Sequence, residues 1–297
     1  SYRRNILINL RIRSFSMADI MEKVPKSPKQ VKEEQDASVR NSLGRIKNKF
    51  IVMSGKGGVG KTSTAVNLSI ALARKGFQVG IMDVDLHGPD VPRMLGLEGM
   101  PDLNSNRKLT PLRYSDRLGV ISMESFLPKR DDAIIWRGPL KFSAIRQFIA
   151  DVEWGDLDFL VIDAPPGTGD EPLTVAQQIP EAQAIIVTTP QEVALADVRK
   201  SISFCRPVKL EIFGLVENMS GLACPHCGEK IDLFGAGGGE RTATEMGIRF
   251  LGRIPIAPKM VACGDSGRSF QESYADSPVT HAFSAIADTM ASLVAPP

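Results

Sequence analysis

The stretch that decides the fold reads S-G-K-G-G-V-G-K-T-S-T at Ser54–Thr64. An apolar run at 50–53 precedes it, and a segment with helical apolar spacing at 65–73 follows it. A strand, a glycine-rich turn and a helix in this order make a phosphate-binding loop, and Gly55 to Thr62 fit the spacing G-x-x-x-x-G-K-[ST]. We therefore predict that nucleotide phosphates bind here.

Each residue type in this loop suits a chemical role. Successive backbone N–H groups of the turn point toward phosphate oxygens, and the positive N-terminal end of the following helix adds to the attraction. We expect Lys61 to contact the β- and γ-phosphates of ATP, and the Thr62 hydroxyl to bind Mg²⁺. The predicted nucleotide-binding residues of the loop are Gly55, Gly57, Gly58, Val59, Gly60, Lys61, Thr62 and Ser63. A glycine-rich turn with an incidental lysine is the alternative, and it does not explain the complete motif.

A second lysine, Lys56, occurs early in the loop and gives G-K-G-G-V-G-K-T. In this feature the chain resembles the deviant Walker A class of ATPases, which includes MinD, ParA and the nitrogenase iron protein. The resemblance implies that Lys56 acts with Lys61 in catalysis, by reaching across a nucleotide-sandwich dimer to the phosphates of the partner. A solvated surface lysine is the alternative interpretation.

Acidic residues follow two of the predicted strands. Asp83 and Asp85 come just beyond a strand at 78–83, and Asp163 ends the apolar strand at 158–162. Open α/β sheets bind ligands outside the carboxyl ends of their strands. The resemblance implies that Asp85 orients the attacking water. We expect Asp83 to support the Mg²⁺ site and Asp163 to hold the Mg²⁺ shell, with turn-forming aspartates as the alternative.

Two further segments are expected to respond to the nucleotide. The loop Asp163–Asp170 contains Pro-Pro-Gly-Thr-Gly and is expected to rearrange when the γ-phosphate leaves. Asn218, which follows a buried strand at 212–216, resembles the adenine-binding asparagine of the class, and its amide offers both a donor and an acceptor. Pro255 is a further candidate beside the base. A strand-terminating turn residue is the alternative for Asn218.

The segment Ser220–Asp232 decides the function, because it contains C-P-H-C-G with Cys224 and Cys227. Two thiolates at this spacing can hold one metal, but a complete zinc or cluster site needs about four ligands, and the chain has no second C-x-x-C. Cys205 and Cys263 are isolated and are expected to be structural. Two chains that meet across a two-fold axis would complete the site.

Several motifs then occur in order: the loop above, D-V-D-L-H-G-P-D-V-P, W-R-G-P at Trp136–Pro139, D-A-P-P-G-T-G-D, T-T-P-Q-E-V-A-L-A-D-V and V-E-N-M-S before C-P-H-C-G. Over roughly 40–285 the chain resembles the Mrp-type (ApbC) iron–sulfur cluster carrier ATPases. The resemblance implies a homodimer that binds a [4Fe–4S] cluster through Cys224 and Cys227, slow ATP hydrolysis, a cluster donor and recipient apoproteins. The N-terminal four-cysteine cluster and the small N-terminal domain of some members are not matched.

Two rival functions remain open. One is a ParA/MinD-like positioning ATPase, whose membrane-bound members use a basic amphipathic C-terminal helix. The predicted helix at 282–294 is amphipathic, but no Lys or Arg follows Arg268, so its apolar face is expected to pack on the core. The other is an ATPase dimer in which Cys224 and Cys227 bind zinc as a structural clip, since thiolates bind Zn²⁺ well.

Composition limits the classes of protein. The 297 residues are 43% hydrophobic, enough for the core of one sizeable domain. The net charge is +2, but residues 1–49 carry +7 and the remainder −5, so neither nucleic acid nor a membrane is an expected partner. No apolar run approaches the length of about 18 residues that a transmembrane helix needs, so none is predicted. Four unevenly spaced cysteines favour a reducing compartment.

Residues 1–49 are predicted to be a basic polar leader before a single ATPase domain at 50–295, which includes the hairpin at 220–232. Within the leader, 1–16 hold four arginines and no acid, which is typical of a mitochondrial transit peptide. They can equally be vector sequence or an extension ahead of Met17, and the initial serine favours this origin. The expected localisation is cytoplasmic, with the mitochondrial matrix as the alternative.

The rest of the chain alternates buried strands with helices. Strands are predicted at 50–53, 78–83, 119–123, 158–162, 184–189, 212–216 and 250–254, and helices at 28–43, 61–74, 140–152, 192–205, 239–246 and 282–294. Continuous apolar strands that alternate with helices indicate a parallel sheet covered on both faces. The predicted fold class is α/β, a single doubly wound, mostly parallel sheet of a P-loop NTPase domain.

Overall fold

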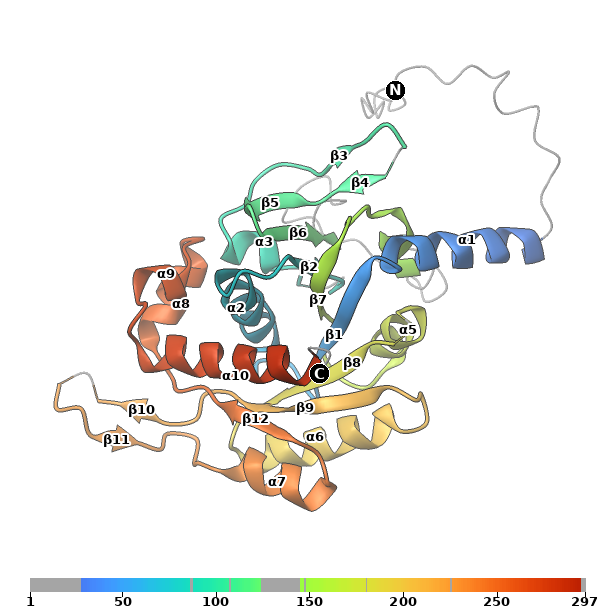
Figure 1. Cartoon of the computed structure of the whole chain (residues 1–297). Helices are drawn as coiled ribbons and strands as arrows, with labels where there is room; N and C mark the ends of the chain where they lie inside the picture. The colour runs from blue at the N-terminus through green and yellow to red at the C-terminus, as the bar shows by residue number, and fades with distance from the viewer. Residues whose placement is uncertain are drawn as a thin grey trace, which may run out of the picture.

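The computed structural model describes residues 28–85, 88–106, 108–123, 145–146, 148–179, 181–224 and 226–294. At its centre lies an eight-stranded sheet in the order β12-β9-β8-β1-β7-β2-β6-β5 (Figure 1). Its strands are β1 (Ile46–Ser54), β2 (Val79–Asp83), β5 (Leu112–Ser115), β6 (Leu118–Ser122), β7 (Leu157–Asp163), β8 (Gln183–Thr188), β9 (Glu211–Glu217) and β12 (Phe250–Arg253). All neighbouring strands are parallel except β5, which is antiparallel to β6.

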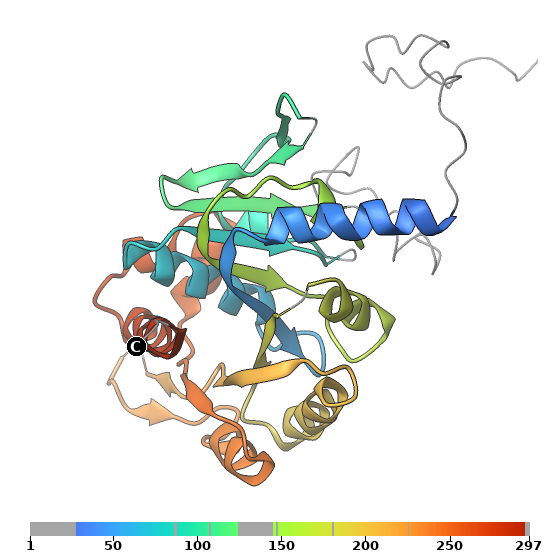
Figure 2. The same cartoon turned by 45° about the vertical axis from the view of Figure 1, so that its right-hand side comes forward.

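Helices cover both faces of this sheet (Figure 2). One face packs against α2 (Lys61–Arg74), α3 (Val91–Met94), α8 (Pro258–Asp265), α9 (Phe270–Ser273) and α10 (Pro278–Val294), and the other against α1 (Pro28–Leu43), α5 (Asp170–Gln178), α6 (Glu192–Cys205) and α7 (Gly238–Met246). We call the layer against α2 and α10 the first core and the layer against α1 and α6 the second core. Along β1, Phe50 and Val52 lie in the first core, whereas Ile51 and Met53 lie in the second. The strands are therefore apolar on both faces, which explains their continuous apolar runs.

The predicted fold class is confirmed by this doubly wound sheet. Three predicted helices are observed with their predicted bounds: 28–43, 61–74 and 192–205. The last helix begins earlier than predicted, at Pro278, since proline is well suited to a first helical turn. Of the helix predicted at 140–152, residues 145–146 and 148–151 are helical. Its first residues and the Trp136–Pro139 motif lie outside the described residues.

The sequence did not predict several short elements. These are α3, α5, α8, α9, β5 and the two-stranded pair of β3 (Asp102–Leu103) and β4 (Leu109–Thr110). All of them span only two to nine residues, which is too short for an apolar period to show clearly. They matter here because α3 and α8 contribute walls of the candidate site.

The helix α1 packs on the body of the protein, although its residues fall within the predicted leader. Val39 and Leu43 are buried in the second core. The hydroxyls of Ser38 and Ser42 donate hydrogen bonds to the carbonyls of Ala150 and Val152, at 3.2 and 2.5 Å. The main sheet also begins at Ile46, so the chain is already packed before the predicted boundary at residue 49.

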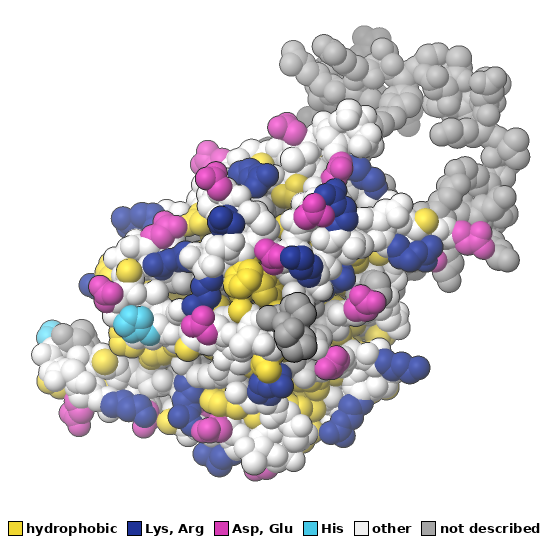
Figure 3. Space-filling model, in the orientation of Figure 1, with side chains coloured by type: hydrophobic (Ala, Val, Ile, Leu, Met, Phe, Trp, Pro, Cys, Tyr) yellow, Lys and Arg dark blue, Asp and Glu magenta, His cyan; other side chains and the backbone are white. Residues whose placement is uncertain are grey.

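Outside the main sheet, β10 (Leu222–Ala223) and β11 (Lys230–Ile231) form a small antiparallel hairpin that reaches away from the body (Figure 1). On the face in Figure 3, basic and acidic side chains are interspersed, so this face carries no large field of one sign. Among the described residues, every helix is too short or too polar to cross a membrane.

Candidate functional site: a phosphate loop and a cysteine hairpin

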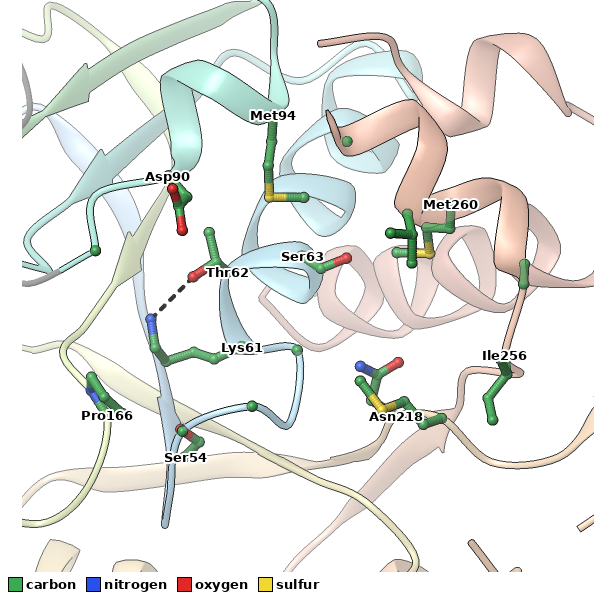
Figure 4. A pocket seen from close by; sticks show the side chains of 18 of the residues that line it. Ser54, Lys61, Thr62, Ser63, Asp90, Met94, Pro166, Asn218, Ile256 and Met260 are labelled. Carbon is green, nitrogen blue, oxygen red and sulfur yellow. Dashed lines mark hydrogen bonds between the residues drawn. The ribbon is translucent and has the colours of Figure 1, made fainter. Parts of the chain in front are cut away.

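The glycine-rich loop joins β1 to α2, as predicted, at the edge of the sheet where the parallel strands end. A pocket of about 870 Å³ opens beside it. Figure 4 shows Lys61 and Thr62 on one side of this pocket and Asn218, Ile256 and Met260 on the other. Small-molecule sites usually have volumes of about 300–1,000 Å³, so the pocket is large enough for a nucleotide.

Gly60 makes the turn from the loop into α2. Its φ of 80° lies in the left-handed region, which favours glycine. A Cβ at this position would also lie 2.2 Å from Nδ2 of Asn218. The absence of a side chain therefore lets the end of β9 approach the loop directly.

Lys61 is held by the acid at the end of β7. Its residue is only 6% exposed, and its ammonium donates to Oδ1 of Asp163 at 2.6 Å. The Thr62 hydroxyl donates to Oδ2 of the same carboxylate at 2.7 Å. Burial raises the pKa of Asp163, and the neighbouring Lys61 ammonium opposes this shift. The three groups predicted for phosphate and Mg²⁺ are thus gathered at one point.

Asp83 and Asp85 have different surroundings. The buried Asp83 carboxylate accepts hydrogen bonds from the backbone N–H groups of Asp85 and Val91 and from the Ser122 hydroxyl, at 3.1, 3.2 and 3.1 Å. Burial raises its pKa well above the ordinary value, and the nearby Asp163 adds to the shift. Asp85 instead lines the pocket, with Oδ2 3.9 Å from Nζ of Lys61. Asp83 therefore fixes the loop that presents Asp85.

Asn218 lies against the loop at the far side of the pocket. Its Nδ2 donates to the carbonyl of Val59 at 2.9 Å, which leaves its side-chain oxygen as an acceptor. Beside it, Pro255, Ile256 and Met260 line the pocket. The sequence analysis named Pro255 but missed the apolar wall of α8, whose signal is the proline at its first turn.

Lys56 does not line the pocket of its own chain. The residue is half-buried, and among the described residues no hydrogen bond or ion pair of its ammonium is found. Gly57 and Gly58 form an exposed rim of the pocket. Of the two lysines in the loop, only Lys61 therefore lines the pocket.

The two cysteines of the C-x-x-C motif lie in the turn between β10 and β11. The turn is closed by hydrogen bonds from Cys224 N to Glu229 O and from Gly228 N to Cys224 O, at 2.8 and 2.9 Å. Backbone N–H groups of Cys227 and His226 donate to the Cys224 sulfur and lower its pKa. Cys227 is exposed and Cys224 half-buried, so both thiols are open to a ligand.

The other two cysteines lie in the core. Cys205 and Cys263 are both buried, and burial raises the pKa of Cys205 to about 11. Within the part of the chain that the structure describes, no group of three or more His, Cys, Asp or Glu residues could hold a metal ion. One copy of the hairpin therefore offers two soft ligands.

The fold and the loop define a P-loop NTPase. Residues 45–291 match the family described as ParA: NUBPL iron-transfer P-loop NTPase. The match spans most of the chain, so the protein belongs to this family.

Named relatives agree with this assignment. An iron-sulfur cluster carrier protein of Methanocaldococcus jannaschii is 47% identical over 240 residues, which are 80% of this chain and 83% of that protein. A cytosolic Fe-S cluster assembly factor NUBP2 homolog of Dictyostelium discoideum is 46% identical over 242 residues, 79% of this chain and 91% of that protein.

Solved structures show the same fold. A nucleotide-binding protein from Archaeoglobus fulgidus in complex with ADP is 39% identical, with a TM-score of 0.71, and the match covers 83% of this chain and 95% of that one. The cell division ATPase MinD of Pyrococcus furiosus matches with a TM-score of 0.63 at 23% identity, over 83% of this chain and 99% of that one.

Proposed function

We propose that this protein is an ATP-dependent iron–sulfur cluster carrier, which binds a [4Fe–4S] cluster between two subunits and delivers it to apoproteins. One observation carries the proposal: a nucleotide-sized P-loop pocket and a pair of accessible thiols, one exposed and one half-buried, occur in the same domain. The relatives named as carriers and assembly factors, at 46–47% identity, support it. The Dictyostelium relative is named as cytosolic, and we propose a cytoplasmic location here too.

ATP is the proposed substrate of the pocket. Lys61 would exchange its bond to Asp163 for the β- and γ-phosphates. The Thr62 hydroxyl and the Asp163 carboxylate would hold Mg²⁺, because both are the hard oxygen ligands that this ion prefers. When bound, Mg²⁺ neutralises charge that develops on the phosphate oxygens. Asp85 faces the same point and would orient the attacking water.

The base is proposed to lie between the loop and α8. The free side-chain oxygen of Asn218 would accept a hydrogen bond from the adenine amino group. Ile256 and Met260 provide the apolar surface that a base needs on its face. In this pose the phosphates would lie over Gly55–Ser63, with Asp83 holding the adjoining loop in place.

In a homodimer, Lys56 would have a role in catalysis. Its ammonium lies outside the pocket of its own chain, and we propose that it contacts the phosphates bound by the partner. Hydrolysis would then require two chains, and the proposed turnover is slow. Loss of the γ-phosphate would release the loop at 163–170, whose Gly167 N–H donates to Ser54 O at 2.9 Å, and this would change the dimer.

The cluster is the cargo of the carrier. Each chain would supply the thiolates of Cys224 and Cys227, so two chains would supply four. Four is the ligand number of a [4Fe–4S] cluster. A cluster donor and recipient apoproteins are therefore the proposed partners. Zn²⁺ would accept the same four thiolates, so a structural zinc is the second candidate.

A membrane-positioning role is less consistent with the structure. On the apolar face of α10, Phe283, Ile286 and Met290 are buried in the first core, and only Leu293 in the last turn is exposed among the large apolar residues described there. This face is thus not available to a lipid surface unless the helix detaches. Lipid vesicles that raise ATP hydrolysis would restore that hypothesis.

Anaerobic reconstitution with iron and sulfide tests the carrier proposal. We expect about two iron atoms per chain and a cluster absorption band in the wild type. Cys224→Ala should lose both, whereas Cys263→Ala, which removes a buried thiol, should keep both. A wild type that binds no iron would overturn the proposal, and stoichiometric zinc after anaerobic purification would favour the structural clip.

A further inference from the structure

Glu217 is a buried carboxylate to which the proposed function has given no role. It is the last residue of β9, and its side chain is 0% exposed. Arg253 on the neighbouring β12 places Nε 3.6 Å from one of its oxygens. A buried carboxylate is costly unless it is paired and hydrogen-bonded, so its contacts indicate what it stabilises.

These contacts join both ends of the segment that carries the cysteines. At the start of the segment, the Ser220 hydroxyl donates to Oε1 of Glu217 at 2.5 Å. At its end, the backbone N–H groups of Gly237 and Gly239 donate to the same carboxylate, at 3.1 and 2.5 Å. Cys224 and Cys227 lie between these two points. One side chain thus holds both ends of the hairpin segment.

The close approach of α7 to this carboxylate depends on glycine. A Cβ on Gly239 would lie 3.0 Å from both Cβ and Oε2 of Glu217, so a larger residue would push the two apart. The N–H groups at the first turn of a helix favour a negative charge. The sequence Gly237–Gly239 is therefore matched to the carboxylate.

The next residue contacts the nucleotide pocket. Asn218 follows Glu217 directly, and its amide donates to the carbonyl of Val59 in the phosphate loop. Its backbone N–H is fixed to Thr188 O at 2.7 Å. A base that engages the side-chain oxygen of Asn218 binds the same amide that holds Val59, and Glu217 lies one peptide unit from this residue.

We propose that Glu217 is a positioning residue that couples nucleotide binding to the cysteine hairpin. The loop, Asn218, Glu217 and the two ends of the segment form a continuous set of contacts about a single strand end. The proposal rests on the carrier function, but it predicts a property of the protein without a cluster. The coupling through Glu217 can therefore be rejected while the carrier function stands, and the carrier function can be rejected while the coupling stands.

The test measures the alkylation rates of Cys224 and Cys227 by peptide mass spectrometry, in the cluster-free full-length chain. Rates are compared with and without Mg²⁺ and a non-hydrolysable ATP analogue. In the wild type we expect the analogue to change them by about fivefold, the lower end of typical coupling between sites. In Glu217→Gln the change should fall below about twofold, while the affinity for the analogue stays within about threefold.

Two internal controls separate positioning from a loss of structure. Glu211→Gln alters an exposed acid at the other end of β9 and should keep the wild-type response. The buried thiols of Cys205 and Cys263 should stay unreactive in every folded variant. If Glu217→Gln does not fold, Ser220→Ala decides, because it removes the bond at one end of the segment and leaves the carboxylate in place.

A wild type whose hairpin thiols ignore the analogue would overturn the proposal, and so would a Glu217→Gln or Ser220→Ala protein that keeps the full response. Iron and sulfide reconstitution of the same samples judges the carrier function separately. Iron binding without a nucleotide response would thus reject the coupling alone. A nucleotide response without iron binding would reject the carrier function alone.

Discussion

The charged groups of the phosphate loop are paired within the chain, whereas the thiols of the cysteine hairpin are open to a ligand. At the loop, Lys61, Thr62 and Asp163 satisfy one another at distances of 2.6 and 2.7 Å, and Asp163 is fully buried. At the hairpin, one thiol is exposed and one half-buried, in the turn between two strands of two residues each. The charged groups of the first region are buried and paired, whereas the thiols of the second are accessible.

This difference indicates a division of labour. Breaking the pairs among buried charged groups is costly. A nucleotide that takes the place of Asp163 as the partner of Lys61 can therefore change the conformation of the surrounding loops. An exposed turn with hydrogen bonds to one sulfur can take up or release a metal centre with little change to the core. Variants that affect one region and spare the other are the way to test whether the two tasks are separate.

The largest effect is expected from Lys61→Ala. Loss of the ammonium removes charge stabilisation at the transferred phosphate, so ATP hydrolysis should fall by about 10²–10³-fold. Iron uptake by the isolated protein should remain, because the hairpin lies outside the loop. Lys47→Ala, at an exposed lysine paired with Asp158, is the matched control and should hydrolyse ATP normally. Normal turnover in Lys61→Ala would mean that the loop has another role.

The next largest effect is expected in the alkylation rates of the Cys224 and Cys205 thiols. The lowered pKa of Cys224 keeps its thiolate populated to lower pH, whereas the pKa of Cys205 is about 11. At pH 8 only about one Cys205 thiol in a thousand is ionised, so Cys224 should be alkylated about 10²-fold faster or more. Mass spectrometry of alkylated peptides between pH 6 and 9 measures both rates. Similar rates in the folded protein would contradict the two environments.

The sequence was sufficient for the phosphate loop because each of its signals is local. The strand, the glycines, the lysines and the helix follow one another within about twenty residues, and periodicity reveals them directly. The same holds for the strands that end in Asp83 and Asp163, whose continuous apolar runs require burial on both faces. These features needed no knowledge of the tertiary structure.

Contacts between distant segments could not be predicted in this way. The bond from Asn218 to Val59 joins residues 159 positions apart, and nothing in either segment specifies the other. The helix α1 is polar over most of its length, so composition alone assigned it to a leader. Only its position against Ala150 and Val152 reveals that Val39 and Leu43 belong to the core. The task of Glu217 is likewise invisible in the sequence.

Two glycines offer a matched comparison of stability. Gly60 and Gly228 have φ values of 80° and 76°, so alanine is strained at both. At Gly60 the new Cβ also meets Asn218 at 2.2 Å, whereas at Gly228 it meets nothing within 4 Å. We expect the free energy of unfolding to fall by about 3 kcal/mol for Gly60→Ala and by about 1 kcal/mol for Gly228→Ala. Urea unfolding measures both, and equal losses would mean that the contact with Asn218 is easily relieved.

The smallest effect is expected at the ion pair of the hairpin. Lys230 and Asp232 lie 3.0 Å apart, with side chains 67% and 45% exposed, so water and salt screen their attraction. The lysine stem also covers Gly221, whose added Cβ would lie 3.0 Å from Cε of Lys230. Lys230→Met keeps the stem and removes the charge, and it should lower the free energy of unfolding by less than about 1 kcal/mol.

Lys230→Ala removes the stem as well, so the difference between the two variants isolates packing from charge. In 0.5 M salt the Debye length falls to about 4 Å, from about 8 Å at physiological ionic strength, so wild type and Lys230→Met should become nearly equal in stability. Iron uptake should persist in both variants, since neither sulfur is touched. A loss of several kcal/mol from Lys230→Met would show that the hairpin, like the phosphate loop, depends on its own charges, and the contrast between the two regions would then fail.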